Sequence, residues 1–166
     1  MFQQNSIAEA WFTQHGIAFA YTIDIEYTRL TPDWNKINEG RPANQPVDEG
    51  LCENYASSMQ AGAVFPAPII APTGAGFEPL DGCQRLTAGE LIGATRFNAY
   101  VLTDLSPDIR ERIRKCANNI LNGKRESEEF TVKQIVDSLY QRQRLSVEEC
   151  ALWSGLNKKV IEREVA

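Results

Sequence analysis

The stretch Leu80-Asp-Gly-Cys-Gln-Arg-Leu-Thr-Ala-Gly-Glu-Leu-Ile-Gly93 decides the fold of the chain. An apolar extended run at residues 67–72 and a glycine-rich turn at residues 73–76 come before it. Residues 95–102 come after it and alternate between apolar and polar side chains as a strand does. The order is therefore strand, tight polar loop, short helix and strand, which predicts an α/β arrangement.

The loop that opens this helix has the composition of an anion site. Asp81 and Gly82 lie at the turn, so the backbone N–H groups of residues 83–87 are expected to point outward at a helix N-terminus. The Arg85 guanidinium lies beside them, and N–H groups with a fixed cation commonly bind phosphate. The alternative is a capped helix whose Arg85 pairs with a carboxylate, and the pattern alone leaves both open. One face of the helix is expected to be buried through Leu86, Leu91 and Ile92.

With its flanks, this stretch resembles the ParB/sulfiredoxin superfamily, whose hallmark is a Gly-x-x-Arg loop opening a helix, often written Asp-Gly-x-x-Arg. Residues 55–62, followed by Phe65-Pro-Ala-Pro-Ile-Ile70, are similar to the family's lead-in of helix, glycine, hydrophobic-Pro-Pro and strand. The resemblance runs over residues 23–102 and continues into a second module. It implies an α/β (α+β) nucleotide-binding domain over residues 1–104, followed by an all-α helix-turn-helix domain over residues 105–166.

The resemblance also implies a ligand, a nucleoside triphosphate (CTP or ATP) with Mg²⁺. Residues 31–50 form a loop rich in Pro, Asn, Gly and charge, and a segment at this place reaches over the nucleotide in the family, which makes Glu39 and Arg41 candidates. A solvated loop is the alternative. The implied nucleotide-binding residues are Arg41, Asp81, Gly82, Cys83, Gln84, Arg85, Asn118 and Asn119.

The two asparagines come from a junction motif. ParB proteins carry Glu-Asn-x-x-Arg there, which reaches back to the phosphates and metal. In this chain Asn118 stands in the Glu position, Asn119 matches the Asn, and Asn122 stands in the Arg position. This departure argues against metal-dependent hydrolysis, so whether the protein is a weak CTPase or ATPase stays open.

Cys83 supports an alternative in a different class, a sulfiredoxin-like or kinase-like phosphoryl-transfer enzyme. Sulfiredoxins carry Gly-Gly-Cys-His-Arg in the corresponding loop, and here Gln84 replaces the His. A thiol at a helix N-terminus beside an arginine has the setting of a nucleophile. However, this chain adds about sixty residues that sulfiredoxins lack, and the interpretation we favour for Cys83 is a small residue packed beneath a phosphate.

The sequence of the second module predicts helices throughout. Ser106 is placed to cap its first helix, and residues 131–142 have helical apolar spacing. In residues 146–163, Gly155 takes a left-handed turn between two helices and Ile161 packs back, which is typical of a helix-turn-helix. A hairpin used only for packing is the alternative. The predicted DNA-contacting residues, which include the caps of both helices, are Ser146, Asn157, Lys158, Lys159 and Arg163.

The remaining elements are predicted from periodicity and caps. A helix over residues 6–15 would begin at a Ser6 cap, and residues 19–27 would form a strand. Residues 47–60 predict a helix whose inward face carries Leu51, Tyr55 and Met59, and Gly62 would close it.

Composition and charge restrict the class of protein. With 43% hydrophobic and 23% charged residues, no apolar run long enough for a membrane span and no signal pattern, the sequence predicts a cytoplasmic protein without a membrane partner. Four widely spaced cysteines and a single histidine argue against a structural zinc site and favour reduced thiols.

Charge differs between the two parts of the chain. Residues 1–106 carry five basic and twelve acidic side chains, whereas residues 107–166 carry twelve basic and ten acidic ones. DNA contact is therefore expected only in the last third, and tight binding would need a homodimer or a longer chain. ParB proteins continue beyond this point, so the sequence is either a minimal relative or a fragment.

Together these patterns predict a ParB-like DNA-binding protein gated by a nucleotide, acting in chromosome or plasmid partition or in plasmid or phage regulation. The nucleotide, the DNA site and the oligomeric state are left open by the sequence.

Overall fold

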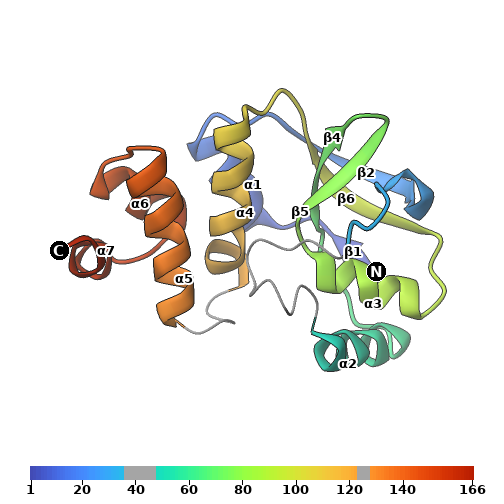
Figure 1. The fold of residues 1–166 in the computed structure, drawn as a ribbon. Coiled ribbons are helices and arrows are strands. Elements are labelled where there is room, and N and C mark those ends of the chain that lie inside the picture. Colours follow the sequence, from blue (N-terminus) through green and yellow to red (C-terminus); the bar gives the residue numbers. More distant parts are fainter. Residues whose placement is uncertain (36–47, 123–127) are drawn as a thin grey trace. The chain divides into compact units, whose positions relative to one another are not determined.

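The computed structural model of the chain describes residues 1–35, 48–122 and 128–166. The chain forms two compact units, Met1–Asp104 and Leu105–Ala166 (Figure 1). The first is a mixed α/β unit and the second is helical, and each is described by itself.

A four-stranded sheet in the order β2-β6-β4-β5 is the centre of the first unit. β2 (Phe19–Glu26) is antiparallel to β6 (Arg96–Leu102), and β6 is parallel to β4 (Ile69–Thr73). β4 is antiparallel to β5 (Gly76–Asp81). The strands predicted before and after the central stretch are therefore confirmed as neighbours, β4 and β6.

Strand β5 is an element that the sequence prediction missed. Residues 74–75 form the tip of a β-hairpin, with Thr73 paired to Gly76, and the chain then runs back along β4 as far as Asp81. Pro79 lies within β5, where its missing N–H group is tolerated because the strand is at the edge of the sheet. The loop that opens the central helix therefore begins at the end of a strand, which fixes Asp81 in place.

Two helices cover opposite faces of the sheet. Phe97 and Tyr100 lie three residues apart in β6, so their side chains point to opposite faces. On one face the Tyr100 ring contacts Phe12 of α1 (Ser6–Gln14), with ring centroids 5.6 Å apart. On the other face Phe97 contacts the Tyr27 ring, whose hydroxyl donates to the Leu86 carbonyl of α3 (Cys83–Leu91) at 2.7 Å.

Several details of the predicted helices need correction. α1 is capped by Asn5, whose side chain accepts from the N–H of Ile7, and not by Ser6. α3 buries Leu86 as expected, but Leu91 is 59% exposed because it lies on the solvent side of the last turn.

Helix α2 (Glu49–Gln60) begins two residues later than predicted, after an Asp48 cap. It contacts α3 and buries Met59 as predicted, but the other buried residues are Cys52 and Ala56, whereas Leu51 and Tyr55 are only half-buried. A short parallel pair, β1 (Phe2–Gln3) and β3 (Phe65–Pro66), completes the unit.

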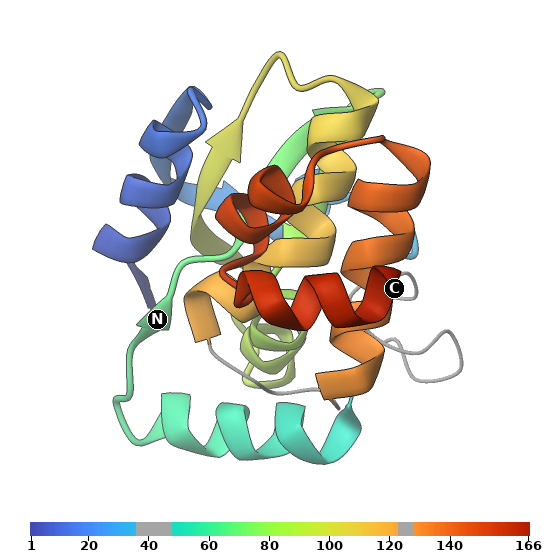
Figure 2. The same cartoon turned by 90° about the vertical axis from the view of Figure 1, so that its left-hand side faces the viewer.

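The second unit is a cluster of helices around an apolar core. α4 (Pro107–Asn122) is capped by Ser106, whose hydroxyl accepts from the N–H of Ile109 at 3.2 Å. α5 (Glu128–Ile135) continues as a π-helical stretch, η2 (Val136–Arg142), and α6 (Val147–Ser154) and α7 (Lys158–Val165) follow. α7, red in Figure 2, contacts both α6 and the α5–η2 helix. The helical apolar spacing predicted for residues 131–142 is confirmed, because its apolar residues are buried: Val132, Ile135, Val136 and Leu139.

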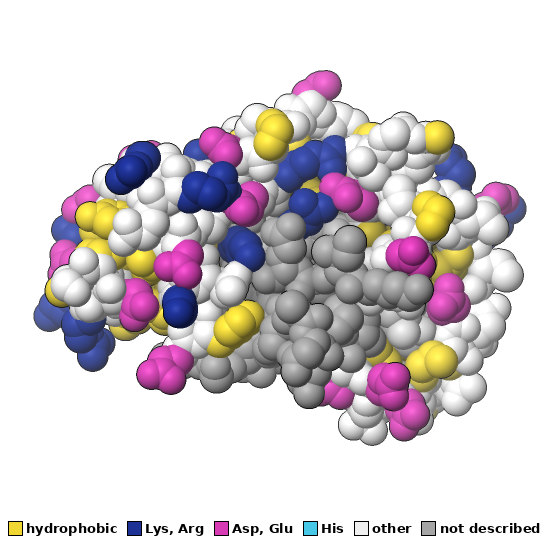
Figure 3. Space-filling model, viewed as in Figure 1, with side chains coloured by type: hydrophobic (Ala, Val, Ile, Leu, Met, Phe, Trp, Pro, Cys, Tyr) yellow, Lys and Arg dark blue, Asp and Glu magenta, His cyan; other side chains and the backbone are white. Residues whose placement is uncertain are grey.

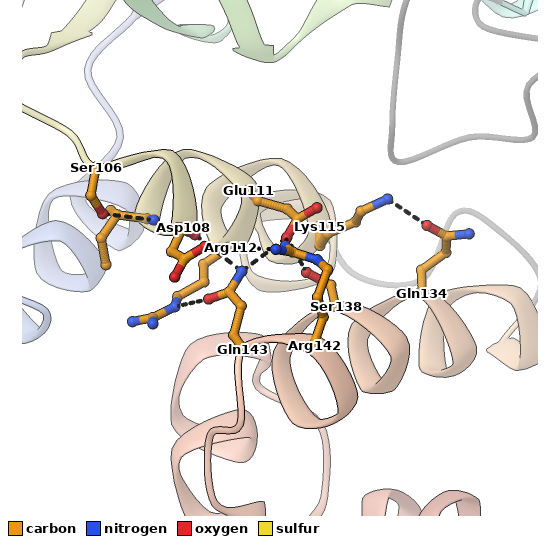
Figure 4. A network of polar contacts seen from close by, with 10 residues as sticks. Ser106, Asp108, Glu111, Arg112, Lys115, Gln134, Ser138, Arg142 and Gln143 are labelled. Carbon is orange, nitrogen blue, oxygen red and sulfur yellow. Dashed lines mark hydrogen bonds and ion pairs between the residues drawn. The ribbon is translucent and has the colours of Figure 1, made fainter.

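A polar network joins α4 to η2 beside this core (Figure 4). The Glu111 carboxylate accepts from the Ser138 hydroxyl at 2.8 Å and from Gln143 Nε2 at 2.9 Å, and it pairs with Arg142. Gln143 also accepts from Arg112 Nε at 2.5 Å. These bonds hold the end of η2 against α4, and the following Arg144 takes a left-handed backbone with φ of 62°.

Candidate functional site

Gly82 is the residue that makes the turn into α3 possible. It is the N-cap of the helix, with φ of 100°, a region that favours glycine. A Cβ built on it would lie 2.6 Å from Pro68 Cβ and 2.9 Å from Arg85 Nη2. The first N–H groups of α3 follow directly, and a helix leaves these groups without partners inside the helix. The N–H of Leu86 is already bonded to the Gly82 carbonyl, so the predicted outward set of residues 83–87 is too long. Anion binding by the N–H groups before Leu86 stays a prediction.

The Arg85 guanidinium does not point outward, as a phosphate-binding arginine would. The residue is 6% exposed, and its guanidinium donates to the Pro66 carbonyl at 2.7 Å and to Asp81 Oδ2 at 2.8 Å. The reason lies in β5, which ends at Asp81 and so places a carboxylate four residues before the arginine. The alternative weighed from the sequence, an arginine paired with a carboxylate, is the arrangement observed.

Gln84 connects the loop to the start of α2. Its Oε1 accepts from the backbone N–H of Asp48 at 2.8 Å, while the Asp48 side chain caps α2 by accepting from the N–H of Leu51. The Cys52 thiol of α2 also lies 3.5 Å from the Gln84 carbonyl oxygen. The N-termini of α2 and α3 therefore lie next to each other, a proximity with no signal in the sequence.

Cys83 is buried and not presented to solvent. Its residue is 4% exposed, and its Sγ lies 4.0 Å from the Trp34 carbonyl oxygen. A buried thiol agrees with the alternative of a small packed residue, because the first turn of α3 directs this side chain into the core.

The remaining predicted nucleotide-binding residues belong to other parts of the chain. Glu39 and Arg41 are outside the described residues. Asn118 and Asn119 lie in α4 of the second unit, where Asn119 Nδ2 donates to the Ser154 carbonyl at the end of α6 at 2.6 Å. Their expected closure over the loop of the first unit stays a prediction.

α6 and α7 are joined by a tight turn, and their predicted caps are confirmed. Ser146 and Glu149 form a reciprocal capping box at the start of α6, and Gly155 ends it with φ of 72°. The Asn157 side chain accepts from the N–H of Lys159 at 2.9 Å and caps α7. Of the residues of α7, Ile161 is the one that is buried.

The predicted DNA-contacting side chains are exposed but not equally available. Asn157 and Ser146 serve as caps, and Arg163 Nε lies 3.5 Å from the Lys159 carbonyl oxygen. Lys158 Nζ pairs with Glu148 Oε1 of α6 at 2.6 Å, an ion-pair partner that the sequence analysis missed. Glu148 and Lys158 are ten positions apart in the sequence and belong to different helices, so only the packing of the two helices brings them together.

Basic and acidic side chains are interspersed over the second unit on the face shown in Figure 3. Within the three described segments, no group of three His, Cys, Asp or Glu side chains could hold a metal ion. No helix among the described residues is long and apolar enough to cross a membrane.

No family model and no curated protein sequence matches the chain. Among solved structures, it is similar to the C-terminally truncated chromosome-partitioning protein ParB from Caulobacter crescentus complexed with CTP-gamma-S. The sequence identity is 12% and the TM-score is 0.43, and the match covers 87% of this chain and 74% of the other.

Proposed function

We propose that the chain is a DNA-binding protein whose DNA engagement is gated by a nucleotide. In this proposal α6, the turn and α7 act as a helix-turn-helix on DNA, and the loop before α3 binds the phosphates of CTP or ATP with Mg²⁺. The role would be ParB-like, in partition or in plasmid or phage regulation. Because both proposed ligands occur in the cytoplasm, the proposal locates the protein there.

The observation that carries the DNA-binding part is the exposed surface of α7. α7 packs through the buried Ile161, and its exposed side carries the cations Lys158, Lys159 and Arg163 together with two acids, Glu162 and Glu164. These cations lie on the helix that enters the major groove in a helix-turn-helix. Because basic residues exceed acidic ones by only two in this third of the chain, we expect weak binding by one copy and stronger binding by a homodimer.

Lys159 tests this surface. Its ammonium has no ion pair within the described residues, so Lys159→Gln should remove one phosphate contact without disturbing the fold. We expect the affinity for a mixed-sequence duplex to fall about three- to tenfold, and the slope of log affinity against log salt to become shallower by about 0.9. Fluorescence anisotropy of labelled DNA at several salt concentrations measures both.

Lys133→Gln is the matched control, since Lys133 is an exposed lysine on α5 of the same unit. A variant there changes the net charge equally but should leave the affinity near that of the wild type. Equal loss in the two variants would contradict a specific role for α7.

The nucleotide-binding part rests on the loop geometry and on the sequence resemblance. The left-handed Gly82 turns the chain into α3, so that the first N–H groups of the helix follow at the half-buried Gln84, and the start of α2 lies beside it. Helix N-termini favour anions through their N–H groups and dipoles. We assign phosphate contact to the backbone of residues 82–84. Arg85 holds the loop in place through its ion pair with Asp81. Asn118 and Asn119 contribute further nucleotide contacts from the second unit.

Gln84→Glu tests this site with little risk to the fold. A carboxylate oxygen can still accept from the N–H of Asp48, and a negative charge is favourable in the first turn of a helix. It would, however, repel a phosphate, and unit charges a few ångströms apart near a protein surface interact by about 1–4 kcal/mol. We therefore expect nucleotide affinity to fall about tenfold or more in calorimetric titrations with CTP and ATP.

The control is Gln4→Glu, which makes the same change at an exposed residue just before α1. Nucleotide affinity should be unchanged there. If Gln84→Glu binds as tightly as Gln4→Glu, the phosphates do not lie at the start of α3.

The alternative of a thiol enzyme has no support in the geometry. A nucleophile must reach its substrate, and the buried Cys83 would have to leave the core to do so.

A further inference from the structure

An ion pair links the first turns of the two helices that we assign to DNA binding. Lys158, the first residue of α7, has its Nζ 2.6 Å from Glu148 Oε1 in the first turn of α6 and 3.8 Å from Glu162 Oε1. Both members of the short pair are exposed, with 51% of the Lys158 side chain and 63% of the Glu148 side chain accessible. The pair is therefore open to competition from a ligand in solution.

The fold does not depend on this pair. The two helices are already held by the buried Ile161, by the left-handed Gly155 and by the capping box of α6. Gly155 lies so close to α4 that an added Cβ would be 2.8 Å from Ile120 Cδ1. Exposed ion pairs add little to stability because water and salt screen them. A stabilising role therefore does not explain why Glu148 is placed against Lys158.

The electrostatics of the pair point to competition. A hydrogen bond from Lys158 lowers the pKa of Glu148, and the same bond raises the pKa of Lys158. Both groups keep their charges near neutral pH. The Glu148 carboxylate therefore already balances the charge of the Lys158 ammonium before any phosphate arrives. The neighbouring Glu149 differs, because its carboxylate accepts from the N–H of Ser146 in the capping box.

We propose that Glu148 is a built-in competitor of DNA phosphate for Lys158, which weakens the phosphate-dependent part of DNA binding. This inference rests on the proposed DNA-binding function. Non-specific affinity comes almost wholly from phosphate contacts, whereas specific affinity also includes contacts with base edges. A carboxylate that occupies one phosphate-binding cation therefore removes about one phosphate contact from DNA binding.

The test compares four variants with the wild type in anisotropy titrations of a mixed-sequence duplex, at about 50 to about 200 mM salt. The variants are Glu148→Gln, Lys158→Gln, the double variant and Glu164→Gln. Glu164 is an exposed acid of α7 and controls for the change in net charge. Thermal unfolding followed by circular dichroism should be the same for all of them, because the pair is exposed.

We expect Glu148→Gln to bind about three- to tenfold more tightly than the wild type, with a salt slope steeper by about 0.9, as for one added phosphate contact. Glu164→Gln should change the affinity much less. The double variant should bind more tightly than Lys158→Gln by no more than Glu164→Gln exceeds the wild type, because the competitor then has no cation to occupy.

Two outcomes would overturn this inference and leave the proposed DNA-binding function standing. One is that Glu148→Gln binds no more tightly than Glu164→Gln. The other is that its gain persists in the Lys158→Gln background, which would make it a general effect of charge. If neither the wild type nor any variant binds DNA at the lowest salt, the proposed function itself fails.

Discussion

Replacing Arg85 with alanine should lower the free energy of unfolding by about 3–5 kcal/mol, the usual cost of removing one member of a buried ion pair. The Arg85 and Asp81 side chains are 7% and 11% exposed, and their atoms are 2.8 Å apart. Without the guanidinium, the Asp81 carboxylate and the Pro66 carbonyl oxygen each lose a charged hydrogen-bond donor in a buried setting. Urea unfolding followed by circular dichroism measures the change.

Arg96→Ala is the matched control. Arg96 forms an ion pair with Glu26 at 3.0 Å in the same unit, but both side chains are more than half exposed. Its loss should cost less than about 1 kcal/mol. The double change of Asp81 and Arg85 to alanine should recover part of the loss, because no unpaired charge then remains buried. Equal costs for Arg85→Ala and Arg96→Ala would contradict the buried pair.

This expectation changes how the nucleotide site should be tested. Loss of nucleotide binding in Arg85→Ala would follow from local unfolding even if the guanidinium never touched a phosphate. Gln84→Glu avoids this difficulty, because it keeps the hydrogen bond to Asp48.

Replacing Gly82 with alanine should cost about 3 kcal/mol of unfolding free energy. A left-handed backbone costs an L-residue roughly 1–2 kcal/mol, and forcing a methyl group into a packed site adds a further 1–3 kcal/mol. The methyl group would overlap Pro68, whose ring is fully buried and cannot move aside. Urea unfolding is again the measurement.

Gly93→Ala separates the two causes. Gly93 follows the C-terminal end of α3 with φ of 83°, and a Cβ built there meets no atom within 4 Å. It should therefore show only the backbone cost, about 1–2 kcal/mol. If Gly82→Ala is no more destabilising than Gly93→Ala, the close approach of Pro68 to the loop is incorrect.

Local signals in the sequence predicted the second unit well. Ser106, Ser146 and Asn157 cap their helices, and Gly155 takes the left-handed turn. Caps and turns depend on a few adjacent residues, so they can be read directly from the chain. The π-helical end of the α5–η2 helix was not predicted, and the contacts of the following Gln143 with the separate helix α4 have no local signal in the sequence.

In the first unit, strand β5 and the pairing of Arg85 could not be predicted from local sequence patterns. Pro79 and Gly76 in a short segment weakened the strand signal of β5, and its place at the sheet edge is what permits Pro79 there. Without β5, nothing in the sequence places the Asp81 carboxylate against Arg85. The direction of the arginine was therefore undecided, although the turn at Gly82 and the helix after it were predicted.

The candidate sites divide in the same way. The exposed cations of α7 followed from helical periodicity. The contacts of Gln84 with Asp48 and of Glu148 with Lys158 join separate helices, and only their packing brings these residues together.

The most direct test of the central claim is the affinity of the wild-type chain for a mixed pool of DNA duplexes, measured by anisotropy with and without CTP or ATP and Mg²⁺. A nucleotide-gated DNA-binding protein should bind in a salt-sensitive manner, and one of the two nucleotides should change its affinity. An affinity for DNA that stays the same with either nucleotide, or no binding at low salt, would contradict the account.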